Sequence, residues 1–490
     1  MTASQRFAAE LVATLAGLGA TNFFLAPGAR SQALAIAAGQ LAKSKTINLT
    51  VRIDERSLGF TALGAALSSG TPSVLITTSG TAVANLHPAV LEAHHAGVPM
   101  ILLTADRPAS LRGKGANQTT LQVGMFGNAV RLELDLNAEA NPVWAAQEAM
   151  SHALQGRPGP VQLNLQFSEP LSSLTPNAEE FYRVQTLELN QPSRTSANVE
   201  ISKRAVVVAG AGGQAAYQFA KLAGVPLFAE PSSGARQPGA VVNYLAHPEL
   251  LDQVEQMIVF GKPTLSRPIV KLASRAQLIV CTSSYETFDV FDRASVVADE
   301  LVPIGQGDPE WLSAFDFPAE TGPRAELVSA VWDATAPGEA LLFGASELIR
   351  VADKTVMPKA IDVFSNRGLS GIDGTTSTAI GIALSGKKTR ALIGDLTLLH
   401  DVGGLNTSGL GELDVQLIVG NDNGGQIFTH LEMAELVSEK DFDLLFRTPQ
   451  SVNLESLANA YGWKYFKAST PEELKPILGL DGFVLVDYSL

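Results

Sequence analysis

The sequence predicts an α/β protein built from doubly wound parallel sheets. Short apolar runs rich in β-branched residues alternate with amphipathic helical patterns, as in residues 73–77 and the following 81–95. Polar clusters follow these runs where each strand would end, and open parallel sheets bind ligands at that edge. Because 490 residues exceed what one ordinary core holds, we expect about three domains.

Composition describes a core-rich protein and excludes some functions. Apolar residues make up 46% and charged residues 17%, and the net charge of −14 argues against a general nucleic-acid surface, which needs basic patches. The single cysteine, Cys281, excludes an intramolecular disulfide, and its apolar run favours a core thiol over a catalytic one. No apolar run approaches the ~20 residues that span a bilayer and no export signal is evident, so we expect a soluble, cytoplasmic protein.

The first region, to about residue 185, has the clearest alternation of strands and helices. Its expected helices include residues 57–68 and 81–95. Since the strands of such a sheet run parallel, the polar residues that follow them should line one edge. The expected strands are residues 22–25, 49–53, 73–77, 100–104 and 161–165.

Arginines among these polar residues indicate an anion site. The polar groups are residues 27–31, 54–57, 78–82, 105–108 and 115–118. Ser31, Ser57 and Thr81 are expected to cap helices, because a hydroxyl oxygen can accept a hydrogen bond from a free backbone N–H. Arg30 and Arg107 do not fit that role, since a cation near a helix N-terminus opposes the helix dipole. Guanidinium groups instead suit two-pronged binding of a carboxylate or phosphate.

The second region, about residues 190–335, opens after a polar linker at residues 191–198. A glycine cluster that includes Gly210 and Gly213 follows an apolar run, and Glu230 ends the next run. The pattern is compatible with a dinucleotide-binding fingerprint, in which the acid contacts a ribose. A tight strand-to-helix turn that binds nothing is the interpretation we favour.

The third region, about residues 338–490, contains a pattern typical of a metal–diphosphate site. Gly394 and Asp395 follow one apolar run, and Asp422 and Gly424 lie in a turn after the next. The segment between them is long enough for a crossover, so the two strands should be parallel neighbours with adjacent carboxyl ends. Carboxylate and carbonyl oxygens suit Mg²⁺ that holds a diphosphate. Either half alone is compatible with an ordinary turn, but the pair resembles the binding signature for thiamine diphosphate (ThDP).

Five motifs of the first region together resemble one family of ThDP enzymes. They are Pro-Gly-Ala-Arg-Ser at 27–31, Arg-Ile-Asp-Glu-Arg-Ser at 52–57, the run from Thr77 to Gly97, Thr-Ala-Asp-Arg-Pro at 104–108 and Gly-Ala-Asn-Gln at 115–118. The sequence is similar there to the 2-succinyl-5-enolpyruvyl-6-hydroxy-3-cyclohexene-1-carboxylate synthases of menaquinone biosynthesis. The resemblance covers most of the first and third regions. It implies a pyrimidine-binding domain at 1–185, a central Rossmann-like domain at 190–335 and a diphosphate-binding domain at 338–490.

The resemblance also implies which residues bind the cofactor. Glu55 would be the catalytic carboxylate that hydrogen-bonds to the aminopyrimidine ring, and Ile372 would hold the cofactor in a V shape. Asp395, Asp422 and Gly424 would bind Mg²⁺ or Mn²⁺. The expected cofactor-binding residues are Glu55, Ile372, Gly394, Asp395, Leu396, Thr397, Asp422, Gly424, Gln426, Ile427 and Phe428.

Two polyanionic substrates are implied by the same resemblance. 2-Oxoglutarate would be decarboxylated, and the resulting succinyl-semialdehyde carbanion would add 1,4 to isochorismate. Arginines suit such anions even in an acidic protein, because local positive potential can orient them. The expected substrate-binding residues are Arg30, Arg107, Gln118, Arg267, Ser346, Arg350 and Arg367.

Two alternatives remain open. Another ThDP-dependent carboligase or decarboxylase, such as an acetolactate synthase-like enzyme, would act on a smaller 2-oxo acid and need fewer cations. A binding protein that has lost the chemistry would not need Glu55. ThDP enzymes of this type build each active site from two subunits, so a homodimer or homotetramer is expected. Two positions depart from the family: Ala29 replaces a serine, and Asp422 replaces the asparagine of many relatives and could shift metal preference toward Mn²⁺.

Overall fold

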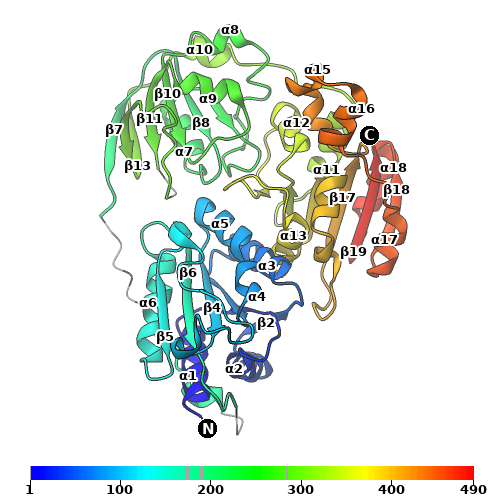
Figure 1. Cartoon of the computed structure of the whole chain (residues 1–490). Coiled ribbons are helices and arrows are strands. Elements are labelled where there is room, and N and C mark those ends of the chain that lie inside the picture. The colour runs from blue at the N-terminus through cyan, green and yellow to red at the C-terminus, as the bar shows by residue number, and fades with distance from the viewer. Residues whose placement is uncertain (1, 173–176, 188, 190–192, 283–284) are drawn as a thin grey trace. The chain divides into compact units, whose positions relative to one another are not determined.

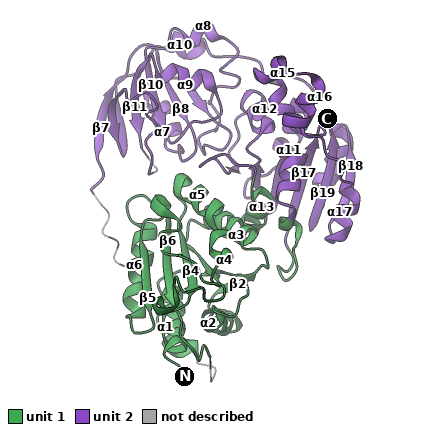
Figure 2. Ribbon diagram, viewed as in Figure 1, with its two compact units in different colours: residues 1–192, 373–386, 403–412 green, residues 193–372, 387–402, 413–490 purple. Residues whose placement is uncertain are grey.

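The structure is a computed structural model that describes residues 2–172, 177–187, 189, 193–282 and 285–490. Its contacts define two compact units, coloured separately in Figure 2. Every strand belongs to a parallel sheet, which confirms the predicted α/β class (Figure 1). Unit 1 contains residues 1–192, 373–386 and 403–412, and unit 2 contains residues 193–372, 387–402 and 413–490.

Unit 1 is built on a six-stranded parallel sheet in the order β2-β1-β3-β4-β6-β5. All five predicted strands are present, although the second ends at Val51 because Ile53, beyond it, is 77% exposed. The edge strand β5 was not predicted, since its residues are at most half-buried and lack a long apolar run. The strands are β1 Asn22–Leu25, β2 Asn48–Val51, β3 Ser73–Thr77, β4 Met100–Asp106, β5 Glu133–Asn137 and β6 Pro160–Gln166.

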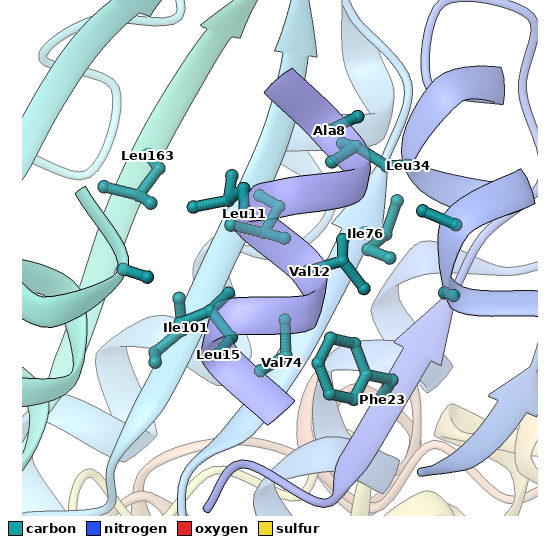
Figure 3. Close-up of a cluster of buried hydrophobic side chains, with 14 of the residues drawn as sticks. Ala8, Leu11, Val12, Leu15, Phe23, Leu34, Val74, Ile76, Ile101 and Leu163 are labelled. Carbon is teal, nitrogen blue, oxygen red and sulfur yellow. The ribbon is translucent and has the colours of Figure 1, made fainter. Parts of the chain in front are cut away.

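Helices cover both faces of this sheet, as expected for a doubly wound fold. Phe23 packs with α1 and Leu34 of α2 in one apolar cluster, shown in Figure 3, whereas its neighbour Phe24 packs in the opposite cluster with Leu58 of α3. The helices and short helical turns of unit 1 are α1 Ala3–Gly17, α2 Gln32–Lys43, α3 Glu55–Ser69, α4 Thr81–Ala84, α5 His87–Ala96, η1 Ala109–Leu111, η2 Gly127–Ala129, α6 Pro142–Leu154, η3 Ala178–Phe181, α13 Thr375–Ala383 and η4 Val402–Leu405, whose last three residues belong to this unit.

One predicted helix is two. Residues 81–95 form α4 and α5, because Pro88 lacks a backbone N–H and stands in the first turn of a new helix. Another pair, α3 and α13, packs closely through glycines: a Cβ on Gly64 would lie 2.1 Å from the Thr378 carbonyl oxygen, and one on Gly381 would lie 2.0 Å from that of Thr61. This contact holds the helix that begins at Glu55.

Unit 2 contains two larger sheets and one small one, all parallel. A five-stranded sheet has the order β12-β11-β10-β8-β9, β13 pairs with β7, and a six-stranded sheet has the order β15-β14-β16-β17-β19-β18. The strands are β7 Ser196–Glu200, β8 Ala205–Ala209, β9 Leu227–Ala229, β10 Gln256–Phe260, β11 Gln277–Cys281, β12 Ala294–Ala298, β13 Glu300–Ile304, β14 Ala340–Phe343, β15 Asp362–Ser365, β16 Thr389–Gly394, β17 Val415–Asn421, β18 Lys464–Ala468 and β19 Phe483–Ser489.

The helices of unit 2 pack on its sheets through apolar clusters. Phe219 of α7 and Leu272 of α9 lie in separate clusters of the five-stranded sheet, and Trp332 of α11 and Ile349 of α12 share one on the six-stranded sheet. The helices and helical turns are α7 Ala216–Ala223, α8 Pro248–Leu251, α9 Arg267–Ala273, α10 Pro309–Ser313, α11 Pro323–Ala334, α12 Glu347–Thr355, α14 Asp395–His400, η5 Gln426–His430, α15 Met433–Leu436, α16 Glu439–Phe442, η6 Asp443–Arg447, α17 Leu454–Ala460 and α18 Pro471–Leu478.

The expected linker is only partly tested. Gln191 and Pro192 lie outside the described residues. Residues 196–198 are not a linker but the start of β7, because their backbone pairs with β13. Of the described helices, none combines the length and the apolar character needed to cross a bilayer.

The glycine cluster of the second region forms a tight turn. A Cβ on Gly210 would lie 2.0 Å from the Pro263 nitrogen, and one on Gly213 would lie 2.6 Å from the Phe260 carbonyl oxygen. The chain's own backbone therefore packs closely against both glycines, as a tight strand-to-helix turn requires. Glu230 is buried and accepts hydrogen bonds from the backbone N–H groups of Thr264 and Leu265, at 2.6 and 2.8 Å. The glycine contacts confirm the tight turn, and the two hydrogen bonds occupy Oε1 of Glu230 within the protein.

Candidate active site

The metal–diphosphate pattern lies where two neighbouring strands end. β16 and β17 pair in parallel over their whole common length, with Gly394 opposite Gly420. Asp395 begins α14 directly after β16, and Asp422 directly follows β17. All these strands are parallel, but β15 is added on one side of β14, and β16 and β17 are added on the other side. The switch point between β14 and β16 opens a crevice at the carboxyl edge of the sheet. The predicted crossover and the adjacent carboxyl ends are confirmed.

A cavity of about 240 Å³ opens at this edge, entirely within unit 2. It brings together every cofactor residue expected outside the first region, and one expected substrate residue. These are Ile372, Gly394, Asp395, Leu396, Thr397, Asp422, Gly424, Gln426, Ile427 and Phe428, with Ser346.

The carboxylates of Asp395 and Asp422 line this cavity and interact electrostatically. Burial raises the pKa of Asp395, and the negative charge of Asp422 raises it further. Hydrogen bonds from the backbone N–H groups of Leu396 and Gly424 to the Asp395 carboxylate act in the opposite direction. A cation bound at this point would offset the repulsion between the two acids.

The donor set fits a magnesium ion that shares a diphosphate. The described residues contain no cluster of three or more His, Cys, Asp or Glu side chains that could hold a metal by themselves. Mg²⁺ typically takes one or two carboxylates and fills its octahedron with phosphate and water oxygens, so Asp395, Asp422 and a carbonyl oxygen suffice. Gly394 leaves open space where a Cβ would stand, and Gly424, at φ +123°, has backbone geometry that favours glycine. The carbonyl of Gly424 accepts only one hydrogen bond in the described structure, from Gln426 N–H at 2.9 Å, and a carbonyl has a second lone pair.

The sequence analysis missed one charged residue of this cavity, Arg324. Its Nη2 donates a 2.8 Å hydrogen bond to Oδ2 of Asp422, and both side chains line the cavity. A signal for Arg324 existed, because it is a cation next to Pro323 in the first turn of α11, where it opposes the helix dipole.

A second cavity of unit 2, about 1150 Å³, contains the expected substrate arginines Arg267 and Arg350. Glu347 and Ile427 line both cavities, so the two are adjacent. Arg350 donates to the Ser346 carbonyl oxygen at 2.8 Å, whereas the Arg267 side chain is 78% exposed and pairs with Glu432 at 3.3 Å. Lys271 and Lys354 also line this cavity and were not predicted.

Arg367 lines neither of these two cavities. Its guanidinium is buried and donates a hydrogen bond from Nε to the Thr264 hydroxyl at 3.1 Å. Burial raises the pKa of Glu230 to about 7, and the charge of Arg367 acts in the opposite direction. In the described structure the Arg367 guanidinium therefore interacts with polar groups of the protein itself, Thr264 and Glu230.

Unit 1 brings together its three expected substrate residues. Arg107 is buried and donates to the Ser79 hydroxyl at 2.7 Å and to the Gln118 carbonyl oxygen at 2.6 Å. The Gln118 side chain in turn donates to the Ser79 carbonyl oxygen at 2.9 Å. Burial and the positive charge of Arg107 lower the pKa of Arg30, whose Nη1 donates to the Phe167 carbonyl oxygen at 3.0 Å. Gly28 lets the end of β1 approach β3, since a Cβ there would lie 2.3 Å from Thr78.

The capping predictions for three hydroxyl residues were wrong. Ser31 stands at the N-cap of α2, but its hydroxyl donates to the Gly28 carbonyl oxygen and makes no cap bond. Thr81 follows the true N-cap of α4, Gly80. Ser57 lies inside the first turn of α3, because Asp54 is the N-cap and accepts from Arg56 and Ser57 N–H at 2.9 and 3.2 Å. The position relative to the first helical turn decides which side chain can cap, and a suitable residue type one to three positions later cannot.

Glu55 is the first residue of α3 and is half-buried. Its placement at the carboxyl edge of the unit 1 sheet matches the prediction, since β2 ends at Val51 and the helix begins four residues later. The cap by Asp54 fixes the backbone of the turn that carries it.

Fold and site together define the class of protein. Residues 5–125 match the family described as thiamine pyrophosphate enzyme, N-terminal TPP binding domain. Residues 350–487 match the family described as thiamine pyrophosphate enzyme, C-terminal TPP binding domain. The chain is a thiamine pyrophosphate enzyme by both matches.

Its relatives narrow the class to one family. Proteins called 2-succinyl-5-enolpyruvyl-6-hydroxy-3-cyclohexene-1-carboxylate synthase match almost the whole chain. The one from Leifsonia xyli subsp. xyli is 40% identical over 96% of this chain and 93% of its own. Those from Clavibacter michiganensis subsp. michiganensis and Arthrobacter sp. are also 40% identical, over 94% and 95% of this chain and 91% and 86% of their own. The chain therefore belongs to the 2-succinyl-5-enolpyruvyl-6-hydroxy-3-cyclohexene-1-carboxylate synthase family.

Proposed function

We propose that the protein catalyses the ThDP- and Mg²⁺-dependent synthesis of 2-succinyl-5-enolpyruvyl-6-hydroxy-3-cyclohexene-1-carboxylate in menaquinone biosynthesis. 2-Oxoglutarate loses carbon dioxide, and the succinyl-semialdehyde carbanion equivalent adds 1,4 to isochorismate. The single observation that carries the proposal is the 240 Å³ cavity, which gathers the expected diphosphate and metal residues in a chain of this family.

In this proposal Asp395, Asp422 and the carbonyl of Gly424 hold Mg²⁺ or Mn²⁺, and the glycine backbone around Gly394 approaches the diphosphate. Ile372 supports the cofactor's bend, and Glu55 accepts a hydrogen bond from its aminopyrimidine ring. Bound ThDP supplies a nucleophilic carbon that can attack a 2-oxo acid. Leu396, Thr397, Gln426, Ile427 and Phe428 complete the cofactor pocket.

Cationic side chains bind the two anionic substrates. Arg30, Arg107 and Gln118 form one group in unit 1, held by the contacts around Ser79. Arg267 and Arg350 line the larger cavity of unit 2, and Ser346 lines the adjacent smaller one. Arg367 is proposed as a further contact, which requires that its guanidinium reach substrate past Thr264. Several arginines suit polyanions better than they suit pyruvate, which has one carboxylate.

The proposal includes three domains and a shared active site. We assign the pyrimidine-binding domain to residues 1–185, the central domain to 190–335 and the diphosphate-binding domain to 338–490, one for each large sheet. Two subunits would combine a pyrimidine-binding and a diphosphate-binding domain, in a homodimer or homotetramer. A reducing cytoplasm suits Cys281, the one cysteine, which is free and buried.

The test is incubation of the protein with ThDP, Mg²⁺, 2-oxoglutarate and isochorismate, with mass spectrometry of the product. We expect an adduct of the two substrates less one carbon dioxide, formed only when ThDP and a divalent metal are both present. Omission of ThDP, and separately addition of a chelator, are the matched controls. Turnover of pyruvate without turnover of 2-oxoglutarate would favour the acetolactate synthase-like alternative.

A further inference from the structure

Asp422 places a second carboxylate in the smaller cavity, beside Asp395. With Asp395 it adds a second negative charge at the point where a diphosphate, itself an anion, is expected. Both carboxylates line one cavity and follow the ends of the paired strands β16 and β17, so two like charges share one site in the folded chain. An arginine at hydrogen-bond distance from Asp422 offsets that charge, and the chain has one, Arg324.

Arg324 is placed for this role by its geometry. Its Nη2 lies 2.8 Å from Oδ2 of Asp422, and the side chains are only 36% and 17% exposed, so solvent screens the pair incompletely. Only one oxygen of Asp422 is used, which leaves Oδ1 for a cation. The buried Nε of Arg324 has no acceptor among the described residues, and Nη2 of the same guanidinium donates to Asp422.

Helix packing does not explain Arg324. It occupies the first turn of α11, whose N-cap Gly322 offers no side chain, and a positive charge there opposes the helix dipole. An arginine at this place destabilises the helix terminus unless a nearby anion offsets it. Asp422, from the turn after β17, is that anion.

We propose that Arg324 is a positioning residue for the metal–diphosphate site: it neutralises and orients Asp422, so that this carboxylate can hold a divalent cation together with Asp395. The proposal rests on the proposed function, because it requires that ThDP and a divalent metal bind in this cavity. Arg324 acts through Asp422 and need not touch the cofactor.

Binding of ThDP, measured by isothermal titration calorimetry at saturating Mg²⁺, tests the proposal without reference to turnover. We expect Arg324→Gln to weaken ThDP binding about tenfold, a typical coupling for a partly buried charged pair. Arg324→Lys should stay within about threefold of the wild type, because a single hydrogen bond to one oxygen does not need the guanidinium fork. Arg275→Gln is the matched control, since Arg275 is also 36% exposed and pairs with an aspartate, Asp252, but does not line the cavity.

The double-mutant cycle separates this role from others. In the Asp422→Asn background, Arg324→Gln should change ThDP affinity by less than about twofold, since the charge to be offset is gone. An equal loss in both backgrounds would mean that Arg324 binds the diphosphate directly, and would overturn the proposal. Unchanged or tighter binding by Arg324→Gln alone would overturn it too, the latter because Arg324 would then compete with the metal.

Two further measurements keep the outcomes distinct. Thermal unfolding of the cofactor-free variants should match the wild type, because removal of a cation from the first turn of α11 does not weaken that helix. Failure of the wild type to bind ThDP with Mg²⁺ would contradict the proposed function itself, whereas normal wild-type binding with unaffected variants would contradict only the role of Arg324.

Discussion

The proposed chemistry is divided between single residues of the two units. The carboxylates of Asp395 and Asp422 are held by neighbours in unit 2: backbone N–H groups bind the first and Arg324 binds the second. Glu55 stands instead on the first turn of α3 in unit 1. Cys281 takes no part, since burial raises the pKa of its thiol to about 11 and keeps it protonated at neutral pH.

Glu55→Gln tests the catalytic carboxylate. We expect kcat for product formation to fall at least about 100-fold, because an amide cannot provide the charge that stabilises the reactive form of the cofactor. The variant should still bind ThDP, measured by calorimetry, since the diphosphate and metal residues are unchanged. Carboligation at the wild-type rate would contradict the assigned role of Glu55.

At the scale of elements, short turns position the functional residues. The N-cap of α3 orients the turn of Glu55, and the α3–α13 glycine contact fixes the helix behind it. In unit 2 the loop between β10 and α9 donates two hydrogen bonds, from the backbone N–H groups of Thr264 and Leu265, to the carboxylate of Glu230 just after β9. Thr264 in that loop also accepts from Arg367.

Asp54→Ala should loosen the turn that carries Glu55. The substitution removes both hydrogen bonds to the backbone N–H groups of Arg56 and Ser57, and loss of an N-cap costs about 1 kcal/mol. We expect a lower denaturant midpoint for unit 1 and a reduced kcat. Asp54→Asn keeps an acceptor and is the control; an equal loss of stability in both variants would show that the cap is not the cause.

Because of the raised pKa of Glu230, we expect the free energy of unfolding to fall as the pH rises. Burial raises its folded pKa from the ordinary 4.5 to about 7, with Asp353 raising it and Arg367 lowering it. Below pH 4.5 both folded and unfolded chains hold the proton; between about 4.5 and 7 only the folded chain holds it. In that window a rise in pH lowers the free energy of unfolding by roughly 2–4 kcal/mol in total.

Glu230→Gln should flatten this dependence, because glutamine has no proton to lose and its oxygen can accept from Thr264 and Leu265. Urea unfolding from pH 5 to 8 measures it, and the variant should be the more stable one at pH 8. Glu255→Gln, at an exposed position, should keep the wild-type slope. A wild-type slope in Glu230→Gln would show that another group titrates.

At the scale of the whole molecule, the proposed site needs residues from both units. Glu55 belongs to unit 1, and Asp395 to unit 2. If two subunits share each site, variants of these two residues can complement one another, because a mixed dimer contains one site built from both unaltered halves.

A mixture of Glu55→Gln and Asp395→Asn subunits, unfolded and refolded together, tests sharing. Random assembly should recover about a quarter of wild-type activity, since half the dimers are mixed and half of their sites are intact. Each variant refolded alone is the control and should remain inactive. Absence of recovery, with mixed dimers verified by mass spectrometry, would place the whole site within one chain.

The parts of this protein that sequence reasoning predicted correctly are those with short-range physical causes. Buried strands show as apolar runs, so β1, β3, β4 and β6 were found, whereas the half-exposed β5 was not. The turn after β17 was predicted from its own residues, which include Asp422 and Gly424. The expected cap at Asp54 was confirmed, whereas those at Thr81 and Ser57 were wrong by one and three residues, because the position of a cap depends on backbone angles that residue types do not specify.

By itself the sequence determined the class of fold, the pairing of β16 with β17 and the presence of Asp395, Asp422 and Gly424 at their ends, since hydrophobic pattern and crossover length are local properties. Only the tertiary structure decided which distant groups meet there. Arg324 reaches Asp422 across 98 residues of sequence, and the space beside Gly210 is filled by the backbone of a loop some 50 residues away. Such contacts follow from how helices and strands pack, and no local pattern contains that information.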